Sequence, residues 1–339
     1  MATCRYARHK DSQDVFCLDG FIEPDDEPED NQSIHYFFNI AYLNDSQLPP
    51  KVDLRPLMTP VENQAKLPSC VPNACAGAYE YLYKRNTGNN FDVSRLFIFY
   101  NARKEKQGSD GKLEVAGVRI PYAIEALKKF GTCDESLWPY DSKKVNKRPP
   151  DEAFEAAKNY TILDELKVNV DLTEMKKCLA EGHPFIFGIR TFQLDKRAKK
   201  NGIVPMPKPG DVSSGMHSRH AMLAVGYSDR SQAFIVRNSW GENWGDKGYC
   251  YIPYDYMTDP NLCRDVWIIR QVDNESFGDE YWDNDDLTNH YEHNDDDVEF
   301  DEDDIELIEL ELELEEEEEE KEEKYVKRIN NNTSSVTSH

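Results

Sequence analysis

The run RNSWGENWGDKGY, residues 237–249, constrains this chain more than any other stretch. It places Asn238 at the end of an apolar strand pattern, with glycine and tryptophan residues just beyond. Upstream, HAMLAVGY puts His220 directly before a second apolar strand, and NQAKLPSC puts Gln64 six residues before Cys70. A cysteine, a histidine and an asparagine far apart in sequence are the parts of a nucleophilic thiol enzyme, because folding rather than spacing brings them together.

Cys70 is the candidate nucleophile because it stands where a helix is expected to begin. Pro72 supports that start, since proline is tolerated in the first turn of a helix but not in its interior. A thiol attacks only as thiolate, and both a nearby imidazolium and the positive end of a helix lower its pKa. Gln64 would donate an amide N–H to the developing oxyanion, together with the backbone N–H of Cys70. The plainer alternatives are a buried core thiol, as expected for Cys75, and a solvated loop glutamine.

His220 is the candidate base that takes the thiol proton and later protonates the leaving amine. The competing His217 lies three residues earlier, in a stretch that reads as loop. Asn238 would bind the far ring nitrogen and fix the imidazole tautomer, and Trp240 would cover that hydrogen bond from water. The alternatives are a structural histidine at a strand start and a glycine-rich turn that holds two core tryptophans.

With these motifs the chain resembles the papain family of cysteine peptidases over about residues 50–272. The resemblance implies an α+β fold of two lobes, a helical N-terminal lobe and a β-barrel-like C-terminal lobe, with the site in the cleft between them. It also implies hydrolysis of peptide bonds in protein or peptide substrates by thiolate attack, through an acyl-enzyme, without a metal or an organic cofactor. The family residues carried over are Cys70, His220 and Asn238, with Gln64 for the oxyanion.

The string around the nucleophile departs from the usual family pattern QGxCGSCW and reads QAKLPSCV. Leu67 stands where the family has a disulfide cysteine, Pro68 replaces a glycine beside the substrate path, and Val71 replaces a tryptophan. These changes bear on specificity and rate rather than on the existence of the dyad. Arg219, directly before the histidine, would oppose an imidazolium unless its charge faces solvent.

The chain divides into an N-terminal extension at 1–50, a peptidase domain at 51–275 and an acidic tail at 276–339. In the domain, helical patterns come first and strand patterns second, which favours an α+β protein with a site between two lobes. The helical patterns begin at Cys70, Ser94, Pro121, Asp151 and Leu172, and the first and third end near Gly88 and Gly131. The strand patterns are PFIFGIRTF, HAMLAVGY, QAFIVRN, GYCYIPY and DVWIIRQV.

The acidity of the chain belongs to its tail. Residues 279–339 carry 26 acidic and four basic residues, so only −3 of the net charge of −25 belongs to the remainder. Like charges at that density repel, and the tail is expected to be disordered at neutral pH. An alternative interpretation makes the tail the functional part of the chain, as a binder of basic proteins or, weakly, of calcium. A polyanion disfavours nucleic acid as a partner.

The eight cysteines leave an odd number once Cys70 is set aside, which argues against a fully paired disulfide framework. They are expected to be buried thiols of a reducing compartment. No apolar run approaches the length of a membrane span, and the N-terminus lacks the apolar segment of a secretory signal. The expectation is therefore a monomeric cytoplasmic or otherwise intracellular protein without membrane contact.

The N-terminal extension has two open interpretations. It is either a short prosegment, with the run IHYFFNIAYL at 34–43 packed on the enzyme or across the cleft, or an arm that caps the folded domain. The function has an alternative as well, a catalytically weak or silent relative that binds peptides or proteins and uses the tail as an adaptor.

Overall fold

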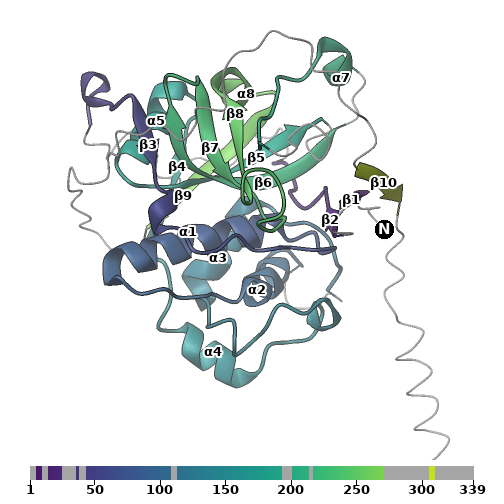
Figure 1. Cartoon of the computed structure of the whole chain (residues 1–339). Coiled ribbons are helices and arrows are strands. Elements are labelled where there is room, and N and C mark those ends of the chain that lie inside the picture. Colours follow the sequence, from purple (N-terminus) through teal and green to yellow (C-terminus); the bar gives the residue numbers. More distant parts are fainter. Residues whose placement is uncertain are drawn as a thin grey trace, which may run out of the picture.

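The computed structural model consists of a helical lobe and a sheet lobe that meet along one long helix (Figure 1). The residues that it describes are 5–9, 14–24, 36–37, 43–107, 113–192, 201–213, 217–270 and 305–309. The expected α+β fold of two lobes is confirmed. None of the helices in these ranges is long and apolar enough to cross a lipid bilayer.

Helix α1 begins at Cys70 and carries Pro72 in its first turn, as expected from the sequence. It ends at Gly88, whose φ of 73° is the left-handed conformation that closes many helices. Ser94 starts the next helix, because its Oγ accepts the backbone N–H of Phe97 at 3.1 Å. The helices are α1 (Cys70–Thr87), α2 (Arg95–Gln107), α3 (Ile120–Phe130), α4 (Asp151–Ala157), α5 (Leu172–Ala180), α7 (Pro209–Ser213) and α8 (Tyr254–Thr258). Short 3-10 helices are η3 (Asp45–Gln47), η4 (Arg55–Leu57) and η5 (Ser142–Lys144).

Seven strands form the main sheet in the order β4-β9-β5-β6-β7-β8, with β3 paired to β6 off this path. Every pair in it is antiparallel. The strands are β3 (Lys51–Asp53), β4 (Asp164–Val168), β5 (Phe185–Thr191), β6 (Ser218–Ser228), β7 (Ala233–Arg237), β8 (Tyr249–Pro253) and β9 (Cys263–Arg270). Within the described residues β4 and β8 do not pair with each other, so the barrel-like lobe is an open sheet.

The five apolar strand patterns of the sequence are β5 to β9, and they are consecutive neighbours in this sheet, from β9 to the edge strand β8. Their runs are apolar on both faces because helices or loops cover both faces. The edge strand β4 has the sequence DELKV and is only half-buried. Its charged residues hide the alternation of apolar and polar residues, so β4 was not predicted from the sequence.

Helix α1 joins the two lobes. Its residues from Cys70 to Leu82 are all buried, and it packs against β6 on one side and against α2 and α3 on the other. Gly77 permits the close approach to the sheet, since a Cβ there would lie 3.1 Å from Nε of Arg237. The thiol is thus positioned by a helix segment in which every residue is buried.

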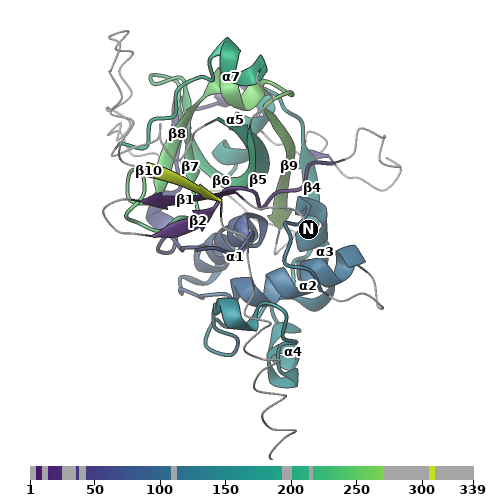
Figure 2. The ribbon, with the colours of Figure 1, turned by 90° about the vertical axis from the view of Figure 1, so that its right-hand side faces the viewer.

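A second, three-stranded sheet lies at the junction of the two lobes, where β1 and β2 run between α1 and the main sheet (Figure 2). Its order is β10-β1-β2, with β1 at Arg5–His9, β2 at Val15–Cys17 and β10 at Ile305–Glu309. Strand β10 belongs to the acidic tail, so the structure differs from the expected disorder over those five residues. The rest of the tail lies outside the described residues, and its expected basic partner stays a prediction.

The run at 34–43 is described at Tyr36, Phe37 and Leu43. Tyr36 bridges to Lys167 of β4, and Phe37 is fully buried near the ring of His183. These two residues therefore pack on the sheet lobe, and a different part of the extension reaches the cleft. The cysteine expectation also changes, because Cys17 is disulfide-bonded. The described cysteines that are free and buried are Cys70, Cys75, Cys133, Cys178, Cys250 and Cys263.

Two helix-ending glycines test how tightly the helical lobe is packed. Gly88 and Gly131 have φ values of 73° and 72°. A Cβ on Gly88 would meet nothing within 4 Å, whereas one on Gly131 would lie 2.0 Å from the carbonyl oxygen of Ala157. We expect Gly88→Ala to lower the free energy of unfolding by about 1–2 kcal/mol, the cost of the backbone conformation alone. Gly131→Ala should cost roughly 3 kcal/mol or more, because its ψ of −154° lies in a region that only glycine adopts readily and because a clash is added. Urea unfolding measures both, and equal losses would contradict these two additional costs.

Candidate active site

The thiol of Cys70 is completely buried at the first residue of α1. The backbone N–H of Ala221 donates to its Sγ at 3.4 Å. Burial raises the pKa of Cys70 to about 12, and backbone N–H groups, including those of Ala221 and Val71, oppose that rise only in part. In this state the group is therefore a neutral thiol, although it sits where a helix favours negative charge.

The imidazole of His220 lies in β6 and is buried beside Asn238, which follows β7. Nε2 of His220 and Oδ1 of Asn238 are 2.8 Å apart. Burial lowers the pKa of His220 to about 4, against the opposing effects of the Asn238 hydrogen bond and the Asp19 charge. Among the described residues, Nδ1 of His220 has no hydrogen-bond partner. The imidazole is neutral, and the ion pair with the thiolate is not formed.

Asn238 and Trp240 hold the imidazole as the sequence predicts. Oδ1 of Asn238 also accepts the backbone N–H of Ser239 at 2.8 Å, which identifies that atom as the oxygen. Nε2 of His220 is then the donor of the shared bond, so the proton sits on Nε2 and the basic nitrogen is Nδ1. The ring of Trp240 lies 4.8 Å from that of His220 and excludes water from the bond. The competing His217 is half-buried at the end of the cleft, near Phe192.

Gln64 is fully buried near the nucleophile, and its side-chain amide nitrogen donates two hydrogen bonds within the protein. Its Nε2 donates to the carbonyl oxygens of Leu67 at 3.0 Å and of Cys17 at 3.2 Å. Its Oε1 accepts the hydroxyl of Ser239 at 2.6 Å, which fixes the orientation of the amide. The amide is thus placed and oriented near Cys70, but one of its N–H groups is bound to the N-terminal extension.

Residues 14–24, which we call the strap, pass directly over the nucleophile at the junction of the two lobes. A Cβ at Gly20 would lie 2.6 Å from Sγ of Cys70 and 2.9 Å from the carbonyl carbon of Pro68. A Cβ at Gly117 would lie 2.5 Å from the carbonyl oxygen of Gly20. Two glycines are therefore needed for the strap to lie this close to the thiol.

Backbone hydrogen bonds tie the strap to both lobes. On the helical side, the N–H of Ile22 donates to the carbonyl of Val118 at 3.1 Å, and the N–H of Val118 donates to that of Gly20 at 3.2 Å. On the sheet side, the N–H groups of Gly20 and Phe21 donate to the carbonyl of Arg219 at 3.2 and 3.3 Å. The strap uses backbone groups of both walls of the cleft, as an extended ligand would.

Charged side chains fix both ends of this crossing. Glu23 forms two hydrogen bonds with Arg190, at 2.6 and 2.9 Å. Burial raises the pKa of Glu23, but the hydrogen bond and charge of Arg190 outweigh it and hold the pKa below its ordinary value. Asp19 is bound to Nε of Arg5 at 2.8 Å and accepts the backbone N–H of Arg219 at 3.1 Å.

Apolar side chains of the strap fill the rest of the cleft. Phe16 stacks on Trp240 with the ring centroids 4.4 Å apart. Phe21 lies against Gly188 of β5, where a Cβ would be only 2.1 Å from its ring. Phe16, Leu18 and Phe21 are all at most 4% exposed. At about 1.5–3 kcal/mol for each buried side chain, the strap is held far more firmly than a frayed terminus.

The departures from the family pattern are accommodated without disturbing the imidazole. The side chain of Arg219 is 51% exposed, and its Nε lies 3.4 Å from a carboxylate oxygen of Glu23. Its charge therefore faces outward and is balanced, so the expected conflict with an imidazolium does not arise. Leu67 and Val71 are buried in the core, where they replace the family's disulfide and tryptophan with apolar packing.

The strap itself was not predicted from the sequence. The signal that could have indicated it is glycine inside apolar runs, at Gly117 and Gly188, because such positions often mark a close approach by another segment. Nothing local to residues 14–24 shows which surface they cover.

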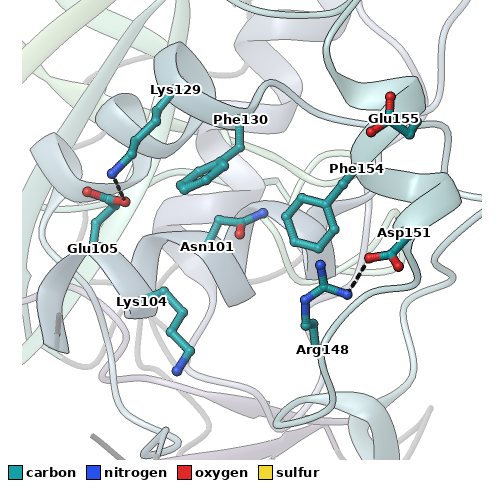
Figure 3. Close-up of a pocket in the computed structure, with 9 residues that line it drawn as sticks. All are labelled: Asn101, Lys104, Glu105, Lys129, Phe130, Arg148, Asp151, Phe154 and Glu155. Carbon is teal, nitrogen blue, oxygen red and sulfur yellow. Dashed lines mark hydrogen bonds and ion pairs between the residues drawn. The ribbon is translucent and has the colours of Figure 1, made fainter. Parts of the chain in front are cut away.

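A separate hollow of about 610 Å³ lies on the helical lobe between α2, α3 and α4 (Figure 3). Phe130 and Phe154 stand beside it, and most of its charges are paired, Lys129 with Glu105 at 2.9 Å and Arg148 with Asp151 at 2.7 Å. Its lining residues are Asn101, Lys104, Glu105, Lys129, Phe130, Arg148, Asp151, Phe154 and Glu155. None of them belongs to the strap or to the candidate active site.

A cysteine at a helix start, with a histidine–asparagine pair on the facing sheet, defines a hydrolase of the thiol-dependent class. A family model described as papain family cysteine protease matches residues 48–266. The chain is 36% identical over 259 residues to an uncharacterized peptidase C1-like protein of Acanthamoeba polyphaga mimivirus, across 72% of this chain and 81% of that protein. The chain belongs to the papain family of cysteine proteases and is a cysteine peptidase.

Other relatives agree with this assignment. The chain is 27% identical over 230 residues to chymopapain of Carica papaya, across 65% of this chain and 60% of that protein. Xylellain, a cysteine protease from Xylella fastidiosa, superimposes with a TM-score of 0.65 at 31% identity, over 76% of this chain and 97% of that chain. Digestive procathepsin L 3 of Tenebrio molitor shares the fold, with a TM-score of 0.55 at 18% identity, over 71% of this chain and 74% of that chain.

Gly20→Ala tests whether the strap restricts access to the thiol. The added Cβ has no room above Sγ, and overpacking of this kind costs about 1–3 kcal/mol. The strap should leave the cleft more often, so alkylation of Cys70 by iodoacetamide should rise by roughly five- to 100-fold. Mass mapping of the labelled protein measures the rate. Gly210→Ala is the control, because a Cβ there meets nothing within 4 Å. Equal rates in both variants would contradict the expected contact.

Proposed function

We propose that this chain hydrolyses peptide bonds in protein or peptide substrates through the thiolate of Cys70. The observation that supports this most directly is the 2.8 Å hydrogen bond between His220 and Asn238, which leaves Nδ1 as the basic nitrogen. A buried imidazole in one tautomer, on the strand that faces the start of α1, is the arrangement that a thiol nucleophile needs.

In the first half of the reaction, the proton of the Cys70 thiol passes to Nδ1 of His220. The sulfur then forms a bond to the substrate carbonyl carbon, and the oxygen becomes an oxyanion. The backbone N–H of Cys70 and Nε2 of Gln64 stabilise that oxyanion. When the C–N bond breaks, His220 gives its proton to the leaving amine, and a thioester remains on Cys70.

In the second half, His220 takes a proton from water, whose oxygen attacks the thioester carbonyl. The C–S bond breaks, the acid product leaves, and the sulfur recovers its proton from the imidazolium. Asn238 keeps the ring in place through both proton transfers. Gln64 can serve only when its N–H is released from the carbonyl of Cys17, so the strap must leave first.

Three variants test these roles in protein from which the strap has been removed. Cys70→Ala should abolish hydrolysis of a fluorogenic peptide, and His220→Ala should lower kcat/KM by about 10²–10⁴. Asn238→Ala should cost about 10², because the imidazole loses its orientation but keeps its proton-accepting nitrogen. Cys75→Ala is the matched control, because it removes a buried thiol from the same helix. If the strap-free parent protein and Cys75→Ala hydrolyse the peptide no faster than Cys70→Ala does, the protein is instead a silent peptide-binding relative.

The strap is in turn proposed to be an inhibitory prosegment rather than a structural arm. Three of its contacts support this, because two block groups that the reaction needs and the third occupies the surface of β5. The Gly20 backbone covers the Cys70 thiol, the carbonyl of Cys17 occupies the Gln64 amide, and Phe21 fills the space over Gly188. Burial under the strap also disfavours both charged forms of the dyad.

The released segment ends before residue 43. The backbone N–H of Leu43 donates to Glu181 at 2.8 Å, and the carbonyl of Pro49 accepts the hydroxyl of Tyr227 at 2.7 Å. Strand β3 then pairs with β6, so this later part of the extension belongs to the domain. These contacts support a prosegment that ends before residue 43.

Deletion of residues 1–24 tests the prosegment. In the intact chain the Cys70 pKa of about 12 keeps the thiolate scarce at neutral pH, so alkylation should be slow and should rise with pH. Without the strap, a neighbouring imidazolium and the helix start lower that pKa, and alkylation should increase by about 10² or more at pH 6–7 and vary little above it. Iodoacetamide labelling from pH 4 to 9 measures this. A synthetic peptide of residues 1–24 should restore the slow rate, and identical profiles with and without the strap would contradict the proposal.

A further inference from the structure

Strand β1 has two neighbours from opposite ends of the chain. Its inner edge pairs with β2 of the strap, and its outer edge pairs antiparallel with β10 of the acidic tail (Figure 2). Without β10, the sheet would be a hairpin with a five-residue and a three-residue strand. Two-stranded hairpins are marginally stable in water, and a third strand is normally needed for independent stability. The tail therefore supplies the strand that completes this sheet.

The register between β1 and β10 is complementary in charge. It sets Glu309 opposite Arg5 and Glu306 opposite Arg8, and both of the intervening positions pair apolar residues. Directly opposite residues of opposite sign stabilise an antiparallel pair by about 0.2–1 kcal/mol each. A slip by one residue would lose both charge pairs and exchange the two faces of the strand. The sequence of the tail thus specifies this pairing, within a region that is otherwise repetitive acid.

Strand β1 is linked to the nucleophile through the ion pair of Arg5 with Asp19. Arg5 donates to both carboxylate oxygens of Asp19, at 2.8 and 2.9 Å, and also to the carbonyl of His217. Asp19 directly precedes Gly20, whose backbone covers the thiol of Cys70. The backbone N–H of Leu18 also donates to the carbonyl of Arg5 at 2.8 Å. A displacement of β1 would therefore move the strap at its contact with the nucleophile.

We propose that the tail segment Ile305–Glu309 controls access to Cys70 by holding β1, and through it the strap, in the closed position. The outer edge of β1 is a docking edge for an acidic strand with apolar residues between its charges, and the occupant is this chain's own tail. This inference rests on the strap being inhibitory, as proposed above. It adds that the strap opens when the tail strand dissociates, before any cleavage of the chain.

Two variants of the natural chain remove the pairing between β1 and β10. The first lacks residues 300–339. The second replaces both Leu307 and Ile308 by proline, which has no backbone N–H. Successive residues of a strand point their N–H groups to opposite sides, so one of these two N–H groups must point toward β1. Each should raise the rate of Cys70 alkylation by iodoacetamide about tenfold, the factor that corresponds to 1.4 kcal/mol. Backbone amide exchange of residues 5–9 should become faster in the same variants.

A charge exchange tests the register. Arg8→Glu and Glu306→Arg should each raise the alkylation rate by roughly two- to fivefold, and the two together should restore the rate of the natural protein. Arg8 suits this test because Arg5 is already bound to Asp19. Glu318→Arg is the matched control, because it changes the tail charge equally but lies outside the paired strand. A rise in the control equal to that of Glu306→Arg would overturn the specific pairing.

The outcomes separate this inference from the proposed function. If deletion of 300–339 leaves alkylation and exchange unchanged while deletion of 1–24 accelerates alkylation, the strap inhibits and the tail does not hold it. If exchange at 5–9 rises but alkylation stays slow, the strands pair without controlling access, and the inference is overturned. If deletion of 1–24 also has no effect on alkylation, the inhibitory role of the strap fails. Faster alkylation and exchange in both tail variants, with rescue by the double charge exchange, supports the inference.

Discussion

The contact between the backbone of Gly20 and the thiol of Cys70 is the constraint on which the state of the whole site depends. Both members of the dyad are buried, and desolvation penalises the charged form of each. The pKa of Cys70 therefore rises to about 12 and that of His220 falls to about 4. A thiolate–imidazolium pair needs the reverse order of acidities, so the covered site is chemically inactive even though its residues are in place. The fold positions the thiol and the imidazole, and access of water to them allows the charged pair to form.

The strap can impose this state because it reaches all parts of the site at once. The nucleophile comes from a helix start, the base from a central strand, and Gln64 from the loop before α1. These positions converge at the junction of the two lobes, where Gly20 of the strap lies over the thiol and the carbonyl of Cys17 accepts from Gln64. Departure of the strap then frees the thiol, hydrates the imidazole and releases the Gln64 amide in one event. A blocking group on any single residue would leave the others exposed to solvent or to other reactions.

The residues that carry local patterns could be predicted from the sequence, and those that depend on distant pairing could not. Cys70 at a proline-marked helix start, His220 before an apolar strand and Asn238 after another were each visible in a short window, and the structure brings them together. Strand β4 was missed because the charges in DELKV mask its alternation. The strap and strands β1 and β10 were missed for a different reason. The pairing of β1 with β10 joins residues near position 5 to residues near position 309, and no periodicity within either strand indicates the other.

The acidic tail is suited to a weak contact with β1 rather than a permanent one. The register sets Glu306 and Glu309 opposite two arginines, while the sequence that follows, ELELEEEEEE, consists largely of like charges, which repel one another. Such surface attraction is reduced by salt, since charges in water are screened within about 10 Å at 0.1 M ionic strength. The apolar burial of Phe16, Leu18 and Phe21 then holds the strap against thermal opening, while the tail strand adds a smaller increment that solution conditions can remove. In the proposed regulation, a large fixed contribution is combined with a small adjustable one, so that access to the buried nucleophile can change without unfolding of the domain.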